Sequence, residues 1–535
     1  MPSPDSAPSG RTTPLAPVPT PSAETLVAFR EVLVRAPFTA AGLRGLWGVD
    51  IDASLDRNNP APARWWLRRH LSPEDPSGRG APDSRAALAA LFVLRMPVVR
   101  EHVDGALGGD LAEALLTSGL LVTDADGRVS ATLALAPYTV PTGVPRGTAP
   151  GDDTLYLFSD FGTLVDPEPV PGEFVLGLGG AGRTLAEITP RSPVTTALDL
   201  GTGCGIQALL LARHADRVVA TDISPRALGI AALNAGLAGV TTIEFRQGSL
   251  FEPVPERFDL VVANPPFVIT PQGRTTTLEY RDGGATGDGI MRALLTGTPD
   301  HLEPDGQAAF LGNWEYGPGR DLPTEWVSEP AGDTSVMVIE RERMDPVTYA
   351  ETWIRDGGVP RAGERWTADT EAWLEDFAAR EVEAIGFGWV RMHRTDTPVR
   401  HFEELTGPLG ANNLGTAAHL ETRLGMLEWL AHAPDEELLR TAFVRAADVT
   451  EHRHFLPGDE SPTMLTIDQG TGFGRTFEAD PALAGLVGVA DGSLDLGAVA
   501  GALAHLLEVD EAALTAQLLE QVRALVPAGV LFPAE

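Results

Sequence analysis

Hydrophobic residues change their spacing along the chain, and the changes predict separate folded regions. From residue 22 to about 119, apolar positions recur every three or four residues in TLVAFREVLV, ARWWLRRHL, RAALAALFVL and DLAEALLTSGL, which predicts short amphipathic helices. Two β-rich runs then flank Asp126-Gly127, which predicts a hairpin. Several helices closed by a hairpin are typical of a winged helix, so we predict an accessory, winged-helix-like domain over residues 22–150.

Apolar β runs alternate with helical segments between residues 151 and 395. This alternation is typical of an α/β domain with a parallel sheet covered on both faces. The clearest predicted strands are TALDL, RVVATD, TIEFRQ, FDLVVA, QAAFLG, TSVMVIE and AIGFGWVRM.

Past residue 396 the periodicity is less regular. A hairpin is expected around residues 441–478, followed by the two helical runs LGAVAGALAHLLEV and EAALTAQLLEQVRALV and by a short VLF run. We therefore predict an α+β C-terminal extension over residues 396–535, for which a second winged-helix-like unit is one interpretation.

Length and composition agree with several domains. The chain has 535 residues, of which 43% are hydrophobic, and one core rarely supports that length. Residues 1–21 are rich in Pro, Ser, Thr and Ala, which predicts a disordered tail. The N-terminus lacks the charge order of a signal peptide, and no run reaches the roughly 18 apolar residues that a membrane helix needs. We therefore expect a soluble, cytoplasmic protein without membrane contact.

Cysteine and histidine usage predicts no disulfide and no metal site. Cys204 is the single cysteine of the chain, so it has no internal partner, as is typical of a reducing compartment. His452 and His454 in EHRHF lack a third ligand nearby in the sequence. We accordingly predict that the protein contains no metal ion.

The net charge of −34 and the isoelectric point near 4.6 oppose non-specific binding to nucleic-acid phosphates. A nucleic-acid substrate would need a local basic channel. Residues 64–70 interleave arginines with tryptophans, a pattern that can bind single-stranded RNA by stacking. The same pattern also suits core tryptophans beside solvated arginines, so the sequence leaves both interpretations open.

The segment ALDLGTGCGI joins a predicted strand to a glycine-rich turn. Gly201, Gly203 and Gly205 alternate, which lets the backbone turn sharply and approach a ligand where a Cβ atom would collide. Asp199 adds a carboxylate at the end of the strand. The next strand ends in Asp222, seventeen residues after Gly205, where a carboxylate can accept both hydroxyls of a ribose. The pattern predicts a nucleoside-containing cofactor.

Nicotinamide oxidoreductases share these features, but their usual spacing is G-x-G-x-x-G. The acid followed by G-T-G-C-G resembles motif I of class I S-adenosylmethionine-dependent methyltransferases. This resemblance implies a Rossmann-like, seven-stranded sheet over residues 151–395 and S-adenosyl-L-methionine as the cofactor. The cofactor-binding residues that it implies are Asp199, Gly201, Thr202, Gly203, Gly205, Asp222, Ile223, Ser249, Leu250 and Asn264.

Two further segments match positions of that family. Ser249 stands where a side chain often contacts the adenine amino group. The stretch VLGLGGAGRTLAEIT, with Gly177, Gly179, Gly180 and Gly182, matches the segment that closes over the methionine part of the cofactor, although a flexible linker is the alternative.

The apolar run FDLVVA ends in Asn264-Pro265-Pro266-Phe267. In a doubly wound sheet, ligands bind beyond the carboxyl ends of the strands. Prolines have no N–H and hold φ fixed, so this turn presents carbonyl acceptors on a stiff backbone. Asn264 adds a side-chain carbonyl, and Phe267 offers a flat apolar face. These groups suit a planar acceptor with an NH2 group, which needs alignment rather than a strong general base.

The tetrapeptide resembles the [D/N/S]-P-P-[Y/F/W] motif of amino-group methyltransferases, which include adenine-N6, ribosomal RNA guanine-N2 and release-factor glutamine enzymes. The resemblance implies that Asn264, Pro265, Pro266 and Phe267 are the catalytic residues. The NPPF form itself resembles the ribosomal RNA and adenine enzymes. In contrast, LFEPV before the strand and DGGATGDGI after it, with Gly283, Gly284 and Gly289, resemble the glutamine enzymes.

We therefore predict an S-adenosylmethionine-dependent N-methyltransferase that acts on a planar amino nitrogen. A nucleobase amine, in RNA before DNA, is the first interpretation of the acceptor. A glutamine amide in a protein, or a small molecule, is the alternative. A binding module that has the fold without turnover is a third hypothesis, and the sequence indicates no particular oligomeric state.

Overall fold

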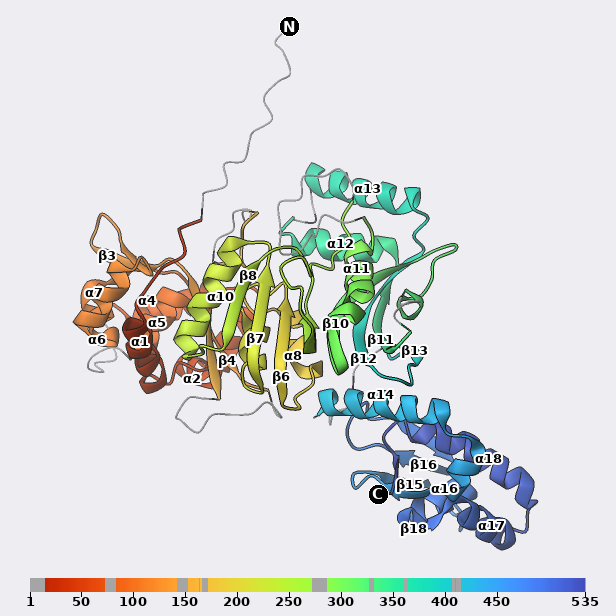
Figure 1. Ribbon diagram of the computed structural model, residues 1–535. Coiled ribbons are helices and arrows are strands. Elements are labelled where there is room, and N and C mark those ends of the chain that lie inside the picture. The colour runs from red at the N-terminus through yellow and green to blue at the C-terminus, as the bar shows by residue number, and fades with distance from the viewer. Residues whose placement is uncertain are drawn as a thin grey trace.

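The structure is a computed structural model of the full chain. It describes residues 15–72, 83–141, 153–162, 164–165, 172–271, 286–326, 332–359, 361, 363–406, 409 and 415–534. Figure 1 shows three regions side by side, with helices α1–α7 at one end, a large sheet in the middle and the C-terminal helices next to the sheet. Within the described residues, no helix is both long and apolar enough to cross a membrane.

The central sheet has eight strands in the order β13-β11-β12-β10-β9-β6-β7-β8. All of its pairs are parallel except the two that β12 makes, with β10 and with β11. The strands are β6 (Val194–Leu200), β7 (Ala215–Asp222), β8 (Ile243–Gln247), β9 (Phe258–Ala263), β10 (Leu302–Tyr316), β11 (Thr334–Met344), β12 (Ala384–Arg394) and β13 (Arg400–Glu404).

The seven predicted strands are all present, and their arrangement confirms the predicted Rossmann-like α/β fold. Strand β13 is an eighth, parallel to β11 at one edge. Its sequence RHFEE has a single apolar residue and no buried position, so its hydrophobic pattern does not predict a strand. The chain order reverses between β6 and β9, which makes this pair of strands the switch point of the sheet.

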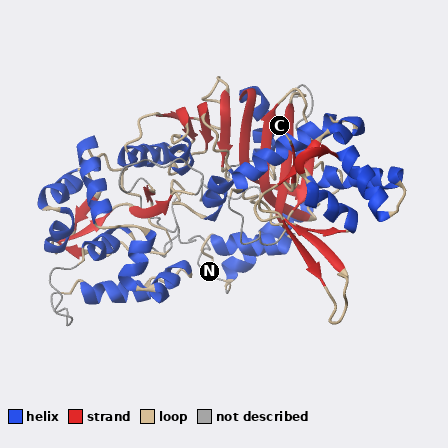
Figure 2. Ribbon diagram, turned by 90° about the horizontal axis from the view of Figure 1, so that it is seen from below, coloured by secondary structure: helices blue, strands red, loops and turns tan. Residues whose placement is uncertain are grey.

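Helices cover both faces of the sheet, as Figures 1 and 2 show. One face packs against α11 (Gly289–Gly297), and the opposite face packs against α8 (Gly180–Ile188), α9 (Ile206–Leu211) and α14 (Thr416–His432). The remaining helices of this region are α10 (Pro225–Ala238), α12 (Pro346–Asp356), α13 (Glu364–Ala379), η1 (Thr298–His301) and η2 (Pro323–Glu325). Coverage on both faces explains why the central strands are almost continuously apolar.

The N-terminal region is helical and includes a small sheet in the order β1-β3-β2. Its helices are α1 (Ala23–Arg35), α2 (Ala40–Trp47), α3 (Val49–Asp56), α4 (Ala61–His70), α5 (Ser84–Phe92), α6 (Arg100–Leu107) and α7 (Gly109–Thr117), and its strands are β1 (Val98–Val99), β2 (Leu121–Thr123) and β3 (Arg128–Ala131). Strands β2 and β3 form the hairpin predicted at Asp126-Gly127. The order helix, strand, two helices and hairpin is winged-helix-like, as predicted, although the fold alone carries no function.

Two features correct the predicted domain limits. Strand β4 (Ala134–Thr139) pairs with β5 (Thr154–Ser159), so the boundary at residue 150 falls between two paired strands, and β13 extends the sheet past the boundary at 395. The predicted tail is also too long. Residues 1–14 lie outside the described residues, but Pro19 is buried, and the Ala16 carbonyl accepts a hydrogen bond from Arg226. Burial against the folded chain outweighs a local composition that is typical of disorder.

The C-terminal region is α+β, as predicted, with two three-stranded sheets in the orders β18-β14-β19 and β15-β16-β17. Its elements are α15 (Asp435–Arg440), β14 (Ala442–Arg445), β15 (Thr450–His454), β16 (Met464–Asp468), β17 (Thr476–Ala479), α16 (Pro481–Val489), β18 (Asp491–Asp495), α17 (Leu496–Leu507), α18 (Glu511–Leu525) and β19 (Leu531–Pro533). Within the stretch 441–478, where a hairpin is expected, β16 pairs with both β15 and β17. Strand β14 pairs instead with strands from the end of the chain, a partner choice that local pattern does not encode.

Phe310 tests the packing of the sheet against α11. This side chain is fully buried in β10, in a cluster that includes Met291 and Leu294 of α11. We expect Phe310→Ala to lower the free energy of unfolding by about 3–5 kcal/mol, because the truncation leaves a cavity. Urea unfolding measures the loss. The exposed Val347 is the control, and Val347→Ala is expected to change stability by less than about 0.5 kcal/mol. Equal small losses for both variants would contradict this packing.

Candidate active site

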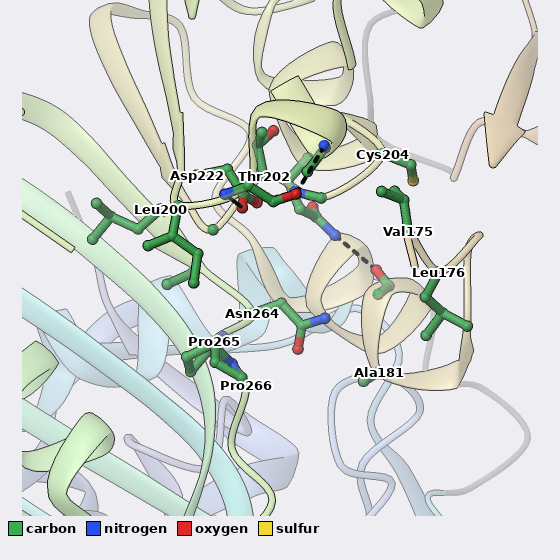
Figure 3. Close-up of a pocket in the computed structure, with 18 of the residues that line it drawn as sticks. Val175, Leu176, Ala181, Leu200, Thr202, Cys204, Asp222, Asn264, Pro265 and Pro266 are labelled. Carbon is green, nitrogen blue, oxygen red and sulfur yellow. Dashed lines mark hydrogen bonds between the residues drawn. The ribbon is translucent and has the colours of Figure 1, made fainter. Parts of the chain in front are cut away.

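A cavity of about 430 Å³ opens at the carboxyl edge of the sheet, between the strand ends of β6 and β9. It therefore lies at the switch point, where ligands bind in open α/β sheets. Figure 3 shows Asn264 pointing into the cavity, between Pro265 and Pro266 on one side and Leu176 and Ala181 on the other. The predicted site residues that line it are Gly201, Thr202, Gly203, Asp222, Ile223, Ser249, Leu250, Asn264, Pro265 and Pro266.

The turn after β6 has a backbone that only glycine adopts easily. Gly201, Gly203 and Gly205 have φ values of +71°, +55° and +88°. An added Cβ atom at Gly205 would lie 2.9 Å from Ala231 Cβ of helix α10, whereas Gly201 and Gly203 have open space on that side. Gly205 thus permits close helix packing and does not line the cavity, while the other two glycines do.

Asp199 holds this turn from below and does not line the cavity. Its side chain is 1% exposed, and its Oδ2 atom accepts hydrogen bonds from Thr202 Oγ1 at 2.6 Å and from Ala208 N at 2.9 Å. Burial raises the pKa of Asp199 to about 7, although these two hydrogen bonds act in the opposite direction. The structure therefore gives Asp199 a supporting position beneath the turn, behind the residues that face a ligand.

Asp222 ends β7 and faces the cavity. Its Oδ2 atom accepts a hydrogen bond from Gly203 N and its Oδ1 atom one from Ser224 N, both at 2.9 Å. Burial raises the pKa of Asp222, and these backbone hydrogen bonds oppose the increase. Each oxygen keeps a second lone pair for a further donor. Asp222 thereby links the glycine turn to helix α10 and presents a carboxylate to the cavity.

The loop after β8 closes another side of the cavity. Gly248 N donates to Asp222 O at 3.1 Å, which connects this loop to the loop after β7. Leu250 has a φ of +45°, a conformation that is rare for a branched side chain and recurs at functional sites. Ser249 and Leu250 both line the cavity, and the apolar Ile223, which is 50% exposed, lines it as well.

Asn264 presents an acceptor that has no partner. Its side-chain Oδ1 atom is buried and forms no hydrogen bond, and Asn264 lines the cavity together with Pro265 and Pro266. Leaving a buried carbonyl oxygen unpaired costs about 1–3 kcal/mol, so proteins rarely do so without a functional reason. A ligand with an N–H group would satisfy this oxygen.

Phe267 is not part of the cavity lining, contrary to the stacking surface that the sequence suggested. Its ring packs against Phe387 at 5.4 Å and Trp353 at 6.2 Å between ring centroids. Two residues later, Ile269 N donates a hydrogen bond to the Tyr349 hydroxyl at 3.0 Å, which also holds the loop in place. The sheet and helix α12 thus fix this loop from behind, and their aromatic groups lie far from it in the sequence.

Two other walls are built by segments for which the sequence carried weaker signals. Residues 174–182 form one wall, which includes the predicted glycines Gly177, Gly179 and Gly182 and the apolar Val175 and Leu176. Helix α11 forms the other, with Gly289 and Ile290. The alternating glycines marked the first segment, and Gly289 and Ile290 end the stretch DGGATGDGI, which resembles the glutamine enzymes. The predicted Gly283 and Gly284 lie outside the described residues.

Other groups that the sequence singled out give no sign of a reactive or metal-binding role. Trp66 stacks on His70 within α4, and the Arg64 side chain donates to the Val165 carbonyl, so both contacts are internal. Cys204 lines the cavity, but burial raises the pKa of its thiol to about 11, which disfavours a nucleophilic thiolate. In the part of the chain that the structure describes, no three His, Cys, Asp or Glu side chains gather as a metal site.

Family comparisons agree with this geometry. Residues 178–318 match the family described as methyltransferase small domain. Residues 35–132 and 423–533 match two families that are both described as domains of unknown function. Together with the relatives below, the first match confirms the predicted resemblance to class I S-adenosylmethionine-dependent methyltransferases of the NPP[YF] group.

Curated relatives are similar to less than a third of this chain. The chain is 36% identical to a release factor glutamine methyltransferase of Cereibacter sphaeroides over 29% of this chain and 58% of the relative. It is 37% identical to a ribosomal protein uL3 glutamine methyltransferase of Bradyrhizobium diazoefficiens over 28% of this chain and 48% of the relative. The chain thus spans only about half the length of these relatives.

The match to solved structures is weak. A ribosomal protein L11 methylase from Lactobacillus delbrueckii shares 23% identity over 41% of this chain and 81% of that chain, with a TM-score of 0.23. A Streptococcus mutans protein in complex with SAH shares 12% identity over 41% of this chain and 99% of that chain, also with a TM-score of 0.23. Since these scores are low, the fold assignment rests on the strand order and the family match.

Asp199 predicts a specific pH dependence of stability. The unfolded chain loses this proton at about pH 4, whereas the folded chain keeps it until about pH 7. Raising the pH across this window therefore favours unfolding. The variant Asp199→Asn cannot ionise at this position. We expect the free energy of unfolding of the wild-type protein to fall relative to that of Asp199→Asn between pH 4 and pH 7. Above about pH 7 the difference between the two proteins is expected to stay constant. Urea unfolding of both proteins across this range measures it, and a difference that does not depend on pH would contradict the assignment.

Proposed function

We propose that this chain transfers a methyl group from S-adenosyl-L-methionine to the side-chain amide nitrogen of a glutamine in a protein. The buried Asn264 Oδ1 atom carries the proposal, because it is an unpaired acceptor in the wall of the cavity. An amide NH2 group is a donor that pairs with such an oxygen. The chain would act as an S-adenosylmethionine-dependent N-methyltransferase.

The residues present fit the cofactor. The glycine turn leaves open space at Gly201 and Gly203, so a nucleoside can approach the backbone there. Asp222 retains free lone pairs for the two ribose hydroxyls, and Ile223 and Leu250 offer apolar surface for the base. When bound, S-adenosyl-L-methionine supplies an electrophilic methyl group on its sulfonium.

The chain contributes alignment at the acceptor. Asn264 Oδ1 and the Pro265 carbonyl would accept the two N–H bonds of the acceptor amide, so its nitrogen faces the inside of the cavity. Pro265 and Pro266 keep this turn stiff and add no competing N–H donors. The aligned nitrogen would attack the methyl carbon as the bond from this carbon to the sulfonium sulfur breaks, with S-adenosylhomocysteine as the leaving group, and would then release a proton. Holding two reactants in line supplies up to roughly 7–11 kcal/mol of a barrier, so no strong base is needed.

A glutamine amide is preferred over a nucleobase for three reasons. The curated relatives described above are named as glutamine methyltransferases. The net charge of −34 opposes contact with nucleic-acid phosphates. The position of Phe267 adds to this preference, since its ring packs against Phe387 and Trp353 and does not line the cavity as a stacking surface for a base. This preference reverses the order in which the sequence ranked the two acceptors.

Asn264→Ala tests the role of the unpaired oxygen. We expect kcat to fall by about 10²–10³-fold, the size of effect seen when one preorganised polar group of an active site is removed, while the affinity for S-adenosylhomocysteine changes little. Turnover with labelled cofactor and calorimetry measure the two quantities. Asn264→Asp is the matched control: it keeps an oxygen in place and is expected to lose less activity than Asn264→Ala. Equal losses of turnover and cofactor affinity would assign Asn264 to the cofactor pocket instead.

The methyl acceptor can be identified by offering protein and RNA substrates to the enzyme separately. We expect transfer of label from labelled S-adenosyl-L-methionine to a peptide-chain release factor or to ribosomal protein uL3, and none to protein-free ribosomal RNA. Replacing the modified glutamine of the labelled substrate by glutamate is expected to abolish labelling, because the carboxylate has no N–H bond and no attacking nitrogen. Labelling of RNA alone would overturn the glutamine proposal and favour the nucleobase acceptor.

A further inference from the structure

The wall of the cavity formed by residues 174–176 is attached to a strand of the N-terminal part of the chain. Asp160 follows β5, and its Oδ2 atom accepts a hydrogen bond from Val175 N at 2.9 Å. In return, Asp160 N donates to Val175 O at 3.1 Å. Val175 and Leu176 line the cavity on the side opposite Leu200 and Pro265 (Figure 3). This wall thus takes its position from the backbone and the carboxylate of Asp160.

The same carboxylate is paired with Arg226, in the first turn of α10. Arg226 Nε donates to Asp160 Oδ2 at 2.9 Å and Arg226 Nη2 to Asp160 Oδ1 at 2.5 Å, which is a two-pronged pair. The side chains are 2% and 9% exposed for Asp160 and Arg226. Arg226 follows Asp222 by four residues. One buried pair therefore connects the wall at residues 174–176 to the side of the cavity that Asp222 forms.

The N-terminal part of the chain covers this pair and packs on the same helix. Arg226 Nη1 donates to the Ala16 carbonyl at 2.6 Å. Two glycines of α10 receive apolar side chains from that part: Val18 Cγ1 lies 3.4 Å from the Cβ position of Gly229, and Leu26 Cδ1 lies 2.8 Å from that of Gly236. The hydrophobic core of the N-terminal region accordingly continues into α10 without a break.

We propose that the Asp160–Arg226 pair positions the cofactor cavity, so that cofactor affinity depends on the docking of the N-terminal region against α10. Asp160 lies outside all three segments that match known families, 35–132, 178–318 and 423–533. The pair acts through Val175 and through the first turn of α10, without touching the reacting atoms. Removing it frees the wall at residues 174–176 and leaves Asn264 in place, so binding weakens more than turnover.

The inference rests on the proposed use of S-adenosyl-L-methionine, and calorimetry with S-adenosylhomocysteine on the full chain separates the two. We expect Asp160→Asn and Arg226→Gln each to weaken binding by about 10-fold. Because both substitutions remove the same interaction, the double variant is expected to bind S-adenosylhomocysteine as well as the more impaired of the two single variants. In turnover, KM for the cofactor is expected to rise by a similar factor, while kcat at saturation changes by less than about threefold. Arg226→Lys keeps the charge but not the two-pronged geometry and is expected to be intermediate.

The control is a pair of similar burial at the opposite edge of the sheet, since α10 packs on β7 and β8 whereas β13 is the other edge strand. Arg423 of α14 pairs with Glu403 of β13, with side chains 5% and 11% exposed, and neither residue lines the cavity. Arg423→Gln is expected to reduce stability and to leave cofactor affinity within about twofold of wild type.

Wild-type binding by folded Asp160→Asn or Arg226→Gln would overturn the inference, as would an equal loss of affinity in Arg423→Gln. If Asp160→Asn and Arg226→Gln both fail to fold, the affinity of Arg226→Lys for S-adenosylhomocysteine decides between the outcomes. A wild-type protein that does not bind S-adenosylhomocysteine would instead overturn the proposed function.

Discussion

The turn between β6 and α9 is the constraint on which the site depends. Its glycines adopt positive φ values, so the backbone reverses direction within a few residues and leaves open space above Gly201 and Gly203. Such a turn needs support from below, which the buried Asp199 provides through Thr202 and Ala208. Asp222 supports it from the side through Gly203 N. Two carboxylates from adjacent parallel strands therefore shape one loop.

The order of the strands places this turn next to the Asn264-Pro265-Pro266 segment. Strands β6 and β9 are neighbours although α9, β7, α10 and β8 separate them in the sequence, and both run in the same direction. Their carboxyl ends consequently meet at one edge, with Gly201 after β6 and Asn264 after β9. The side of the cavity formed by the glycine turn and the side formed by Asn264 thus come from two loops whose relative position the sheet determines. The unpaired Asn264 oxygen lies where both sides meet.

The regions outside the methyltransferase match take part in the same framework. Helix α14 of the C-terminal region packs on the face of the sheet that also carries α8. On the other side of the molecule, the N-terminal region shares its core with α10 and reaches the cavity wall through Asp160. The residues that line the cavity lie between 174 and 294, so the two terminal regions reach it through the elements that they pack against.

The sequence by itself determined the local features: seven strands of the sheet, the glycine turn, Asp222 and the stiff Asn264-Pro265-Pro266 segment. These features depend on side-chain periodicity and on the backbone preferences of glycine and proline, which act over a few residues. Only the tertiary structure decided that Asp199 supports the turn from beneath, that Phe267 packs away from the cavity, and that β13 and residues 15–21 join the folded protein. Those outcomes depend on partners such as Phe387 and Arg226, which lie far away in the sequence. A residue's burial and hydrogen bonds are properties of the packed assembly, so no local pattern specifies them.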